Sequence, residues 1–181
     1  ATFKGEYGEI SSRVTAFYPL KMARNGSFYY PQFPSVQKYY ENGIAPDTFP
    51  MVAYVDFNST DDRVFHFKNL CGILQLNLCG SGGLKVKDLE IVNLDGKPLW
   101  GDCTLSLDGK QGTDQQTMTV NGGNNVIKVS FPQAFILKAS TPRVINVVVP
   151  AGSFAEGFSV KVFDDKGDVL CFLTANTDRV Q

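Results

Sequence analysis

The sequence predicts an all-β fold, a β-sandwich of two mainly antiparallel sheets with transthyretin-like or Greek-key connections. From residue 64 onward, apolar and polar residues alternate with the period of two that is typical of half-buried strands. Turn-forming residues separate these runs at intervals of roughly 8–14 residues. The 17 glycines and nine prolines of the 181 residues are spread along the chain, which suits many short strands joined by turns. A closed barrel would give a similar pattern and stays open as an alternative.

The predicted strands are rich in Val, Ile, Phe and Leu, and they cover residues 64–68, 70–79, 85–94, 103–107, 116–120, 126–131, 143–149, 158–163 and 169–174. In the first of them, the alternation places Phe65 and Phe67 on the inner face and His66 on the other. In the second, Leu74, Leu76 and Leu78 share a face.

Short clusters of turn residues separate the strands. Asp95-Gly96 and Asp108-Gly109 predict two-residue hairpins, because Asp and Gly tolerate the positive φ of a type I′ turn. Residues 121–125 and 164–168 predict further turns. The acidic cluster at 164–168 lacks the spacing of a Ca²⁺-binding loop and a distal Glu, so a plain turn is favoured there, and likewise at Asp61-Asp62.

The first 63 residues differ from the rest because they combine many aromatic residues with five prolines. We therefore divide the chain into an aromatic, proline-rich segment at 1–63, which packs on the sandwich or is the remainder of a truncated module, and a sandwich domain at 64–181. Residues 12–18 alternate as a strand would. Residues 35–42 are expected to form one helical turn at most, because the prolines forbid long helices.

Composition excludes several classes of function. The net charge is −1 and the basic residues are scattered, so there is no cationic stripe of the kind that binds nucleic acid. No apolar run approaches the ~18 residues of a membrane span. We also find no signal peptide in this sequence, which fits either a cytosolic protein or a secreted protein whose leader has been removed.

The four cysteines, Cys71, Cys79, Cys103 and Cys171, lie in apolar alternating runs. We expect buried thiols that act as small apolar residues, and the even count leaves disulfides open. Their spacing does not fit a zinc site. We predict no metal and no cofactor.

Catalysis has little support in the sequence. His66 is the only histidine, so any Ser-His-Asp or Cys-His arrangement would need it, and we expect it to face solvent. A hydrolase with paired carboxylates is disfavoured, because the Asp and Glu residues fall mainly in turns. The sequence therefore favours a protein that is not an enzyme.

Aromatic residues offer a candidate contact surface for a ligand or partner. Trp100 follows the Asp95-Gly96 turn, and the pairs Tyr29-Tyr30 and Tyr39-Tyr40 each place one ring on each side of an extended chain. Exposed rings could stack on sugars, so a glycan-binding surface module is the alternative function. The opposing interpretation is that one ring of each pair belongs to the core.

Several motifs, in order along the chain, resemble the fimbrillin-like proteins of Bacteroides-type bacteria. The matching segments are TAFYP at 15–19, FPSVQKY at 33–39, FPMVA at 49–53, FHFKNLCG at 65–72, LDGKPLWG at 94–101, and VVVPAGSF at 147–154 followed by Gly157-Phe158. The resemblance covers residues 15 to 170, and its specificity comes from the shared order and spacing.

This resemblance implies a secreted protein of the bacterial cell surface, a fimbrial subunit or adhesin. Family members are lipid-anchored to the outer membrane through an N-terminal cysteine of the precursor, and proteolysis frees a groove for a neighbour's strand. The expected partners are other surface or fimbrial subunits, bound by strand addition, or a host or glycan ligand. In such an assembly, a sheet edge would be open, or would be filled by residues 2–7.

Overall fold

The computed structural model describes residues 13–23, 30–56, 64–107 and 116–175. In chain order, the elements are β1 (Arg13–Tyr18), the 3-10 turn η1 (Leu20–Met22), β2 (Gln32–Phe33), β3 (Val36–Lys38), β4 (Met51–Asp56), β5 (Lys68–Asn69), β6 (Cys71–Leu78), β7 (Lys85–Asn93), β8 (Gly101–Leu107), β9 (Gln116–Val120), β10 (Val126–Ile136), β11 (Arg143–Pro150), β12 (Phe158–Phe163) and β13 (Val169–Ala175). Over these residues, the fold is built from strands. None of the helical segments in the described ranges has the length and apolar character that crossing a bilayer requires.

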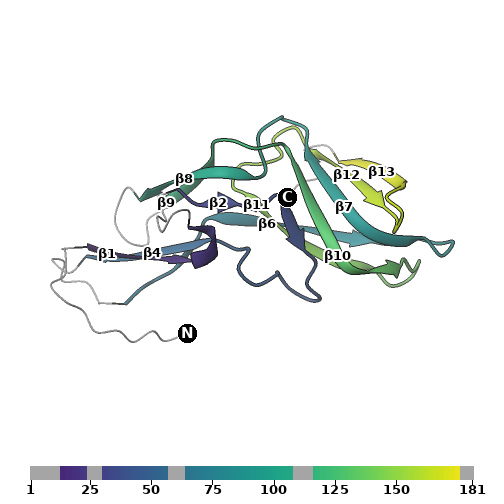
Figure 1. Ribbon diagram of the computed structural model, residues 1–181, viewed down its shortest axis with the longest axis horizontal. Coiled ribbons are helices and arrows are strands. Elements are labelled where there is room, and N and C mark those ends of the chain that lie inside the picture. The colour runs from purple at the N-terminus through teal and green to yellow at the C-terminus, as the bar shows by residue number, and fades with distance from the viewer. Residues whose placement is uncertain (1–12, 24–29, 57–63, 108–115, 176–181) are drawn as a thin grey trace.

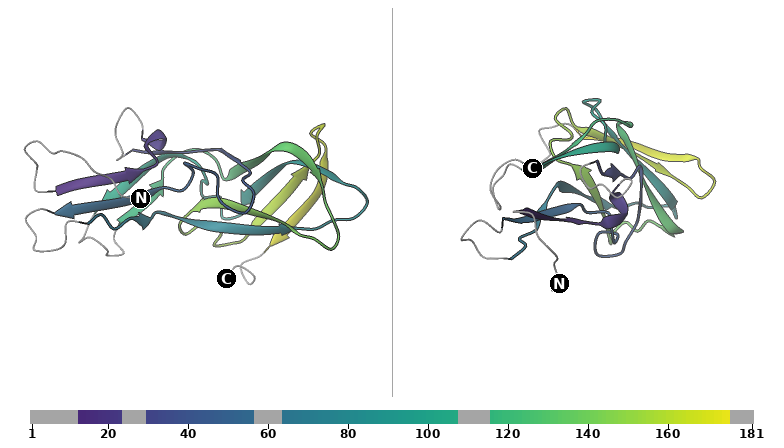
Figure 2. Two further views of the ribbon diagram at one scale, coloured as in Figure 1. Left: turned by 90° about the horizontal axis from the view of Figure 1, so that it is seen from below. Right: turned by 60° about the vertical axis from the view of Figure 1, so that its left-hand side comes forward.

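The strands form a β-sandwich of several mainly antiparallel sheets, as predicted (Figure 1). The largest sheet has the order β13-β12-β7-β10-β3, and β6 pairs with β11 in a second sheet. Sheets β1-β4-β5 and β2-β8-β9 lie at one end of an elongated molecule, and β12 and β13 lie at the other (Figures 1 and 2). The Greek-key and transthyretin-like connectivity stays a prediction.

One continuous hydrophobic cluster joins the sheets. Leu89 and Ile91 of β7, Ile127 of β10 and Ile145 and Val147 of β11 are fully buried within it. The alternation of burial along β8 and in the second half of β6 follows the predicted period of two. Burial of these alternating apolar faces is the main favourable term in the stability of such a sandwich.

A buried glutamine joins the two principal sheets. Gln37 of β3 is 3% exposed, and its side chain forms two hydrogen bonds with Val148 of β11. Its Nε2 donates to the Val148 carbonyl oxygen at 2.7 Å, and its Oε1 accepts from the Val148 N–H at 3.0 Å. The amide thus supplies the partners that a neighbouring strand would give β11 at this point, and it satisfies two backbone groups that would otherwise be buried without partners.

Two of the predicted local elements differ in the structure. Residues 64–67 are not a strand, because pairing with β4 begins only at Lys68, and Phe67 is 38% exposed instead of lying in the core. Residues 36–38 form strand β3, parallel to β10, where a helical turn at most was expected. The parallel pairing with β10 and the buried amide of Gln37 provide long-range contacts that local propensity does not reveal.

Three of the predicted turns lie within the described residues: 164–168 closes a hairpin, whereas 95–96 and 121–125 connect strands of different sheets. Residues 164–168 close the β12–β13 hairpin, as an acidic plain turn should. The hairpin prediction at Asp95-Gly96 was wrong: a turn is present, with Gly96 at φ 76°, but β7 and β8 belong to different sheets. Asp95 instead accepts a hydrogen bond from the N–H of Ala155, so this turn carries the chain from one sheet to the next. Asp108-Gly109 and Asp61-Asp62 lie outside the described residues.

Strands on the two sides of residue 63 pair with one another. Strand β2 pairs with β8, β3 with β10 and β4 with β5. The aromatic N-terminal segment therefore contributes strands to the same sheets as the rest of the chain, while the division into 1–63 and 64–181 stays a prediction.

Candidate functional site: the Trp100 pocket and the β13 edge

Two glycines in close approach fix the position of Trp100. Gly101 has φ 130°, and a Cβ there would overlap the carbonyl oxygen of Gly122. A Cβ on Gly123 would overlap the carbonyl oxygen of Trp100 itself. Only glycine permits two backbones to approach this closely. The preceding residue, Leu99, is fully buried and donates its N–H to the Asn124 carbonyl at 2.8 Å, so Trp100 stands on a tightly held segment.

Trp100 lines a surface pocket of about 510 Å³. The other walls come from η1, β2, β3 and the loop 45–48, and among the lining residues are Lys21, Gln32, Phe33, Lys38 and Asp47. The volume falls within the range of small-molecule sites in proteins. This pocket combines an aromatic wall with charged and amide side chains, which is the composition of a site for a polar ligand with an apolar face.

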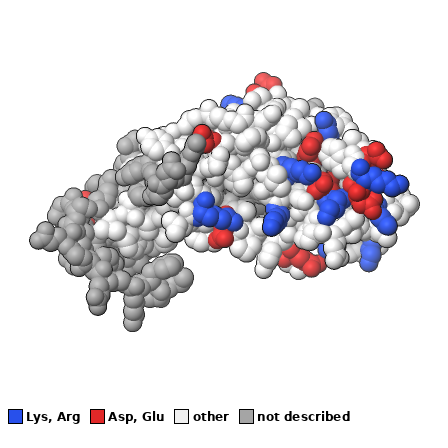
Figure 3. Space-filling view, in the orientation of Figure 1, with Lys and Arg blue, Asp and Glu red and all other residues white. Residues whose placement is uncertain are grey.

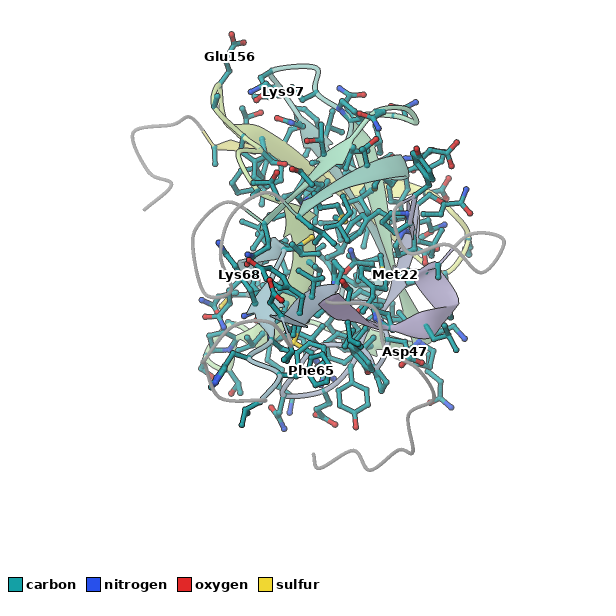
Figure 4. All side chains as sticks on the ribbon, turned by 90° about the vertical axis from the view of Figure 1, so that its left-hand side faces the viewer. Met22, Asp47, Phe65, Lys68, Lys97 and Glu156 are labelled. Carbon is teal, nitrogen blue, oxygen red and sulfur yellow. The ribbon has the colours of Figure 1, made fainter. Side chains whose placement is uncertain are left out.

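Asp47 is held in place on the rim of this pocket. Its φ is 60°, a left-handed conformation that Asp tolerates better than most residues. One carboxylate oxygen accepts a hydrogen bond from the Tyr18 hydroxyl at 3.0 Å, and the other lies 3.5 Å from Lys21 Nζ. Thr48 fixes the same loop by donating to the Ala45 carbonyl at 2.6 Å. Figure 4 shows Asp47 and Met22 on one flank of the molecule, far from Lys97 and Glu156.

A second, more apolar pocket of about 620 Å³ adjoins the first and shares Lys21 and Asp47 with it. Its walls include Tyr18, Leu20 and Phe67, which are 38%, 79% and 38% exposed. The Lys21–Asp47 ion pair therefore lines both pockets, the first with polar and apolar walls and the second with mainly apolar walls.

The structure places the predicted contact residues in different regions. Trp100 is partly buried and lines the pocket, while Tyr30 and Tyr40 are 62% and 53% exposed. Neither tyrosine is among the described residues of the pocket wall. Tyr39 packs on the core, with its ring centroid 4.7 Å from that of Phe131. Tyr29 lies outside the described residues.

The two lysines and Asp47 were not found by sequence reasoning. They come from three separate segments that share no motif, and only the tertiary fold brings them beside Trp100. Trp100 was singled out in the sequence because it is an aromatic residue after the Asp95-Gly96 turn, where an exposed ring could stack on a ligand.

The end of the molecule away from β1 and β4 carries a free apolar strand edge among the described strands (Figure 1). Strand β13 pairs with β12, and none of the described residues pairs with its other side. Val169, Phe172 and Leu173 are 58%, 56% and 54% exposed. Neighbouring side chains of a strand point to opposite faces, so the exposure of both Phe172 and Leu173 leaves both faces of β13 partly uncovered.

Leu173 is on the core-facing side of the sheet in spite of its exposure. It lies directly opposite Val160 of β12, which is 4% exposed, and opposite residues of an antiparallel pair share a face. The core is therefore incompletely covered at this edge. The strand sequence VLCFLTA also lacks the charges and prolines that commonly protect edges.

The other candidate groups have structural roles or are exposed. His66 is exposed, and the described residues include no group of three or more His, Cys, Asp or Glu placed to hold a metal ion. In the turn at 164–168, an Asp164 carboxylate oxygen accepts from the backbone N–H groups of Lys166 and Asp168, both at 2.8 Å. These bonds, that with Asp168 above all, hold the pKa of Asp164 below its usual range.

All four cysteines are free thiols. Cys103 is buried, and burial raises its pKa to about 11. Burial, and next the nearby Cys103, also raise the pKa of Cys71. The prediction of buried thiols was wrong for Cys79, which is exposed just after the end of β6.

Charge on the surface is mixed. In the view of Figure 3, Lys and Arg alternate with Asp and Glu over the half of the molecule that holds β7, β10, β12 and β13. One ion pair between these strands joins Lys128 of β10 and Asp88 of β7, with 3.1 Å between Nζ and a carboxylate oxygen.

No protein-family model and no curated protein matches the sequence.

Proposed function

We propose that this protein is a cell-surface structural subunit or adhesin of the fimbrillin-like kind, which assembles with its neighbours by strand addition at the free edge of β13. The observation that carries the proposal is the uncharged, apolar edge of this strand, with which no other described strand pairs. The ordered motifs of the sequence, from TAFYP at 15–19 to VVVPAGSF at 147–154, support the same class and a location outside the cell.

Two features of this edge favour an added strand: its backbone hydrogen-bonding groups and its exposed apolar side chains. An edge strand presents a row of backbone donors and acceptors, and an added strand pairs with them. The same strand would cover Leu173 and Phe172, removing from water side chains that are more than half exposed. Main-chain pairing thus gives affinity, and the two exposed faces give specificity.

The occupant that fits best is the segment at residues 2–7 of a second copy. Its sequence, TFKGEY, alternates Phe3 and Tyr7 with polar residues and so has one apolar face for the core side. The start of β1, to which this segment leads, lies at the end of the molecule opposite β13 (Figures 1 and 2). This separation favours a neighbouring molecule over the chain's own segment.

Photo-crosslinking tests the proposal on the full chain. We expect a photoreactive phenylalanine analogue in place of Phe172 to yield covalent dimers, with crosslinked peptides that map to residues 2–7. The matched control is the same analogue in place of Ile136, which is equally exposed at 54% and lies at the end of β10. Dimers should be absent or unspecific with this control.

A charge on the edge should prevent assembly. The substitution Leu173→Lys places a charge on the core-facing side of β13, while Ile136→Lys adds the same charge elsewhere. We expect the first to abolish the dimers and the second to leave them. Crosslinks that map away from residues 2–7, or dimers that persist in Leu173→Lys, would show that β13 does not receive this strand.

A further inference from the structure

We infer that the Trp100 pocket binds an acidic sugar residue, a pyranose ring that carries a carboxylate. The pocket shares no residue with β13, so this inference does not depend on strand addition. Three features of the described wall point to this ligand class: a partly exposed indole, a lysine with no ion pair among the described residues, and polar side chains around them.

The aromatic wall accounts for the sugar ring. Trp100 is partly exposed, whereas Phe33 in the same wall is fully buried. One face of a pyranose presents C–H groups with partial positive charge, which suit the electron-rich face of an indole. Gln32 and Ser35 line the same pocket and can exchange hydrogen bonds with the ring hydroxyls.

The charges account for the carboxylate. Among the described residues, the charged groups of the lining are Lys21, Lys38 and Asp47, whose formal charges sum to +1. Asp47 is already engaged by Tyr18 and Lys21, at 3.0 and 3.5 Å. Lys38 forms no ion pair within the described part of the chain, and its side chain projects from an exposed position on β3. A ligand carboxylate beside Lys38 would complete a charge-assisted hydrogen bond.

The charged side chains described in the pocket wall also argue against a phosphorylated ligand. The pocket wall includes no arginine among the described residues, and one free lysine cannot balance a dianion. A single carboxylate matches the one lysine of the described wall that has no ion pair among the described residues.

Tryptophan fluorescence offers a direct test, because Trp100 is the only tryptophan of the chain. The full-length protein is titrated with 3′-sialyllactose and with a hyaluronan tetrasaccharide, two acidic sugars, and with lactose as the neutral counterpart of the first. We expect at least one acidic sugar to change the emission saturably, and lactose to bind at least about ten-fold more weakly. The same affinities are measured by calorimetry.

Variants identify the residues responsible. Lys38→Gln should weaken the acidic sugar about ten-fold and leave any lactose binding unchanged, whereas Lys166→Gln, in the exposed β12–β13 turn, should have no effect. Trp100→Phe should weaken both sugars in calorimetry. The inference is overturned if neither acidic sugar binds, if lactose binds as tightly as 3′-sialyllactose, or if Lys38→Gln and Lys166→Gln behave alike. None of these outcomes alters the crosslinking result at Phe172, so the two proposals fail independently.

Discussion

At the scale of single residues, Gln37 shows how a polar side chain can substitute for a strand. A strand amide and carbonyl usually find their partners on a neighbouring backbone, yet Val148 finds both on one side chain. The position cannot be identified in the sequence, since a glutamine between Val36 and Lys38 reads as a surface residue. Its burial follows only from the approach of β3 to β11.

Removal of this amide should destabilise the protein. Gln37→Ala leaves the N–H and C=O of Val148 buried without partners, and we expect a loss of about 2–4 kcal/mol in the free energy of unfolding. Urea denaturation followed by circular dichroism measures it. Gln75→Ala is the control, because Gln75 is exposed on β6 and its side chain donates a hydrogen bond to Asn146 at the surface. Equal effects of the two substitutions would contradict the structural role given to Gln37.

The thiols should differ strongly in reactivity. With a pKa of about 11, about a thousandth of Cys103 is thiolate at pH 8, and burial restricts access as well. Brief alkylation at pH 8 should therefore modify Cys79 first and leave Cys71 and Cys103 intact, as counted by mass spectrometry. Cys79→Ser should remove the fast phase, and guanidinium should expose all four thiols. Fast labelling of Cys103 in the folded protein would show that its burial is overstated.

At the scale of elements, the connections between sheets are harder to predict from the sequence than the strands themselves. Strands 116–120 and 158–163 were predicted with their observed bounds, because residues at alternate positions are apolar over most of each strand. Turn chemistry was also visible, but which strands a turn joins depends on pairings far apart in the sequence. For this reason Asp95-Gly96 was correctly assigned to a turn and wrongly to a hairpin.

The contact between Gly101 and Gly123 gives a clear test of such a connection. Gly101→Ala should lower the free energy of unfolding by about 2–3 kcal/mol or more, because the new Cβ overlaps the Gly122 carbonyl and the φ of 130° strains any side chain. Gly122→Ala is the matched control, since no atom lies within 4 Å of its Cβ position. Thermal unfolding measures both. Comparable stability of the two variants would contradict the close approach.

The Asp164 turn should make a pH-dependent contribution to stability. Its carboxylate is stabilised by backbone N–H groups in the folded state, so its pKa is lower there than in the unfolded chain. The contribution is therefore present above the unfolded pKa of about 3.8 and is lost as the pH falls through the folded pKa.

Accordingly, Asp164→Ala should melt at a lower temperature than the wild type at pH 7, and the gap should close as the pH is taken below 4. Asp165→Ala removes an equal charge from the same turn and controls for net charge. A gap that stays constant with pH would mean that the ionised carboxylate is not what holds the turn.

At the scale of the whole molecule, the fold class was accessible from the sequence and the candidate site was not. Period-two burial needs only local pattern, and it predicted a sandwich of mainly antiparallel sheets. The pocket beside Trp100 needs Lys21, Lys38 and Asp47 to meet across three segments, which no spacing rule encodes. The structure separates Tyr39 and Tyr40 from Trp100, because the first ring packs on the core and the second is exposed to solvent.

The two hydrogen bonds between the Gln37 side chain and Val148 also determine where the two layers of the sandwich can separate. The layers are fastened together where β3 meets β11, while β13 and β6 each have a free side among the described strands. We therefore expect the two layers to stay in contact near Gln37 and to separate first at the edges farthest from it. Backbone amides of β12 and β13 should exchange with deuterium earlier than those of β10 and β7, and mass spectrometry of peptides can follow this. A strand added at β13 would pair with its free edge, so the deuterium exchange of the β12 and β13 backbone amides should slow as assembly proceeds.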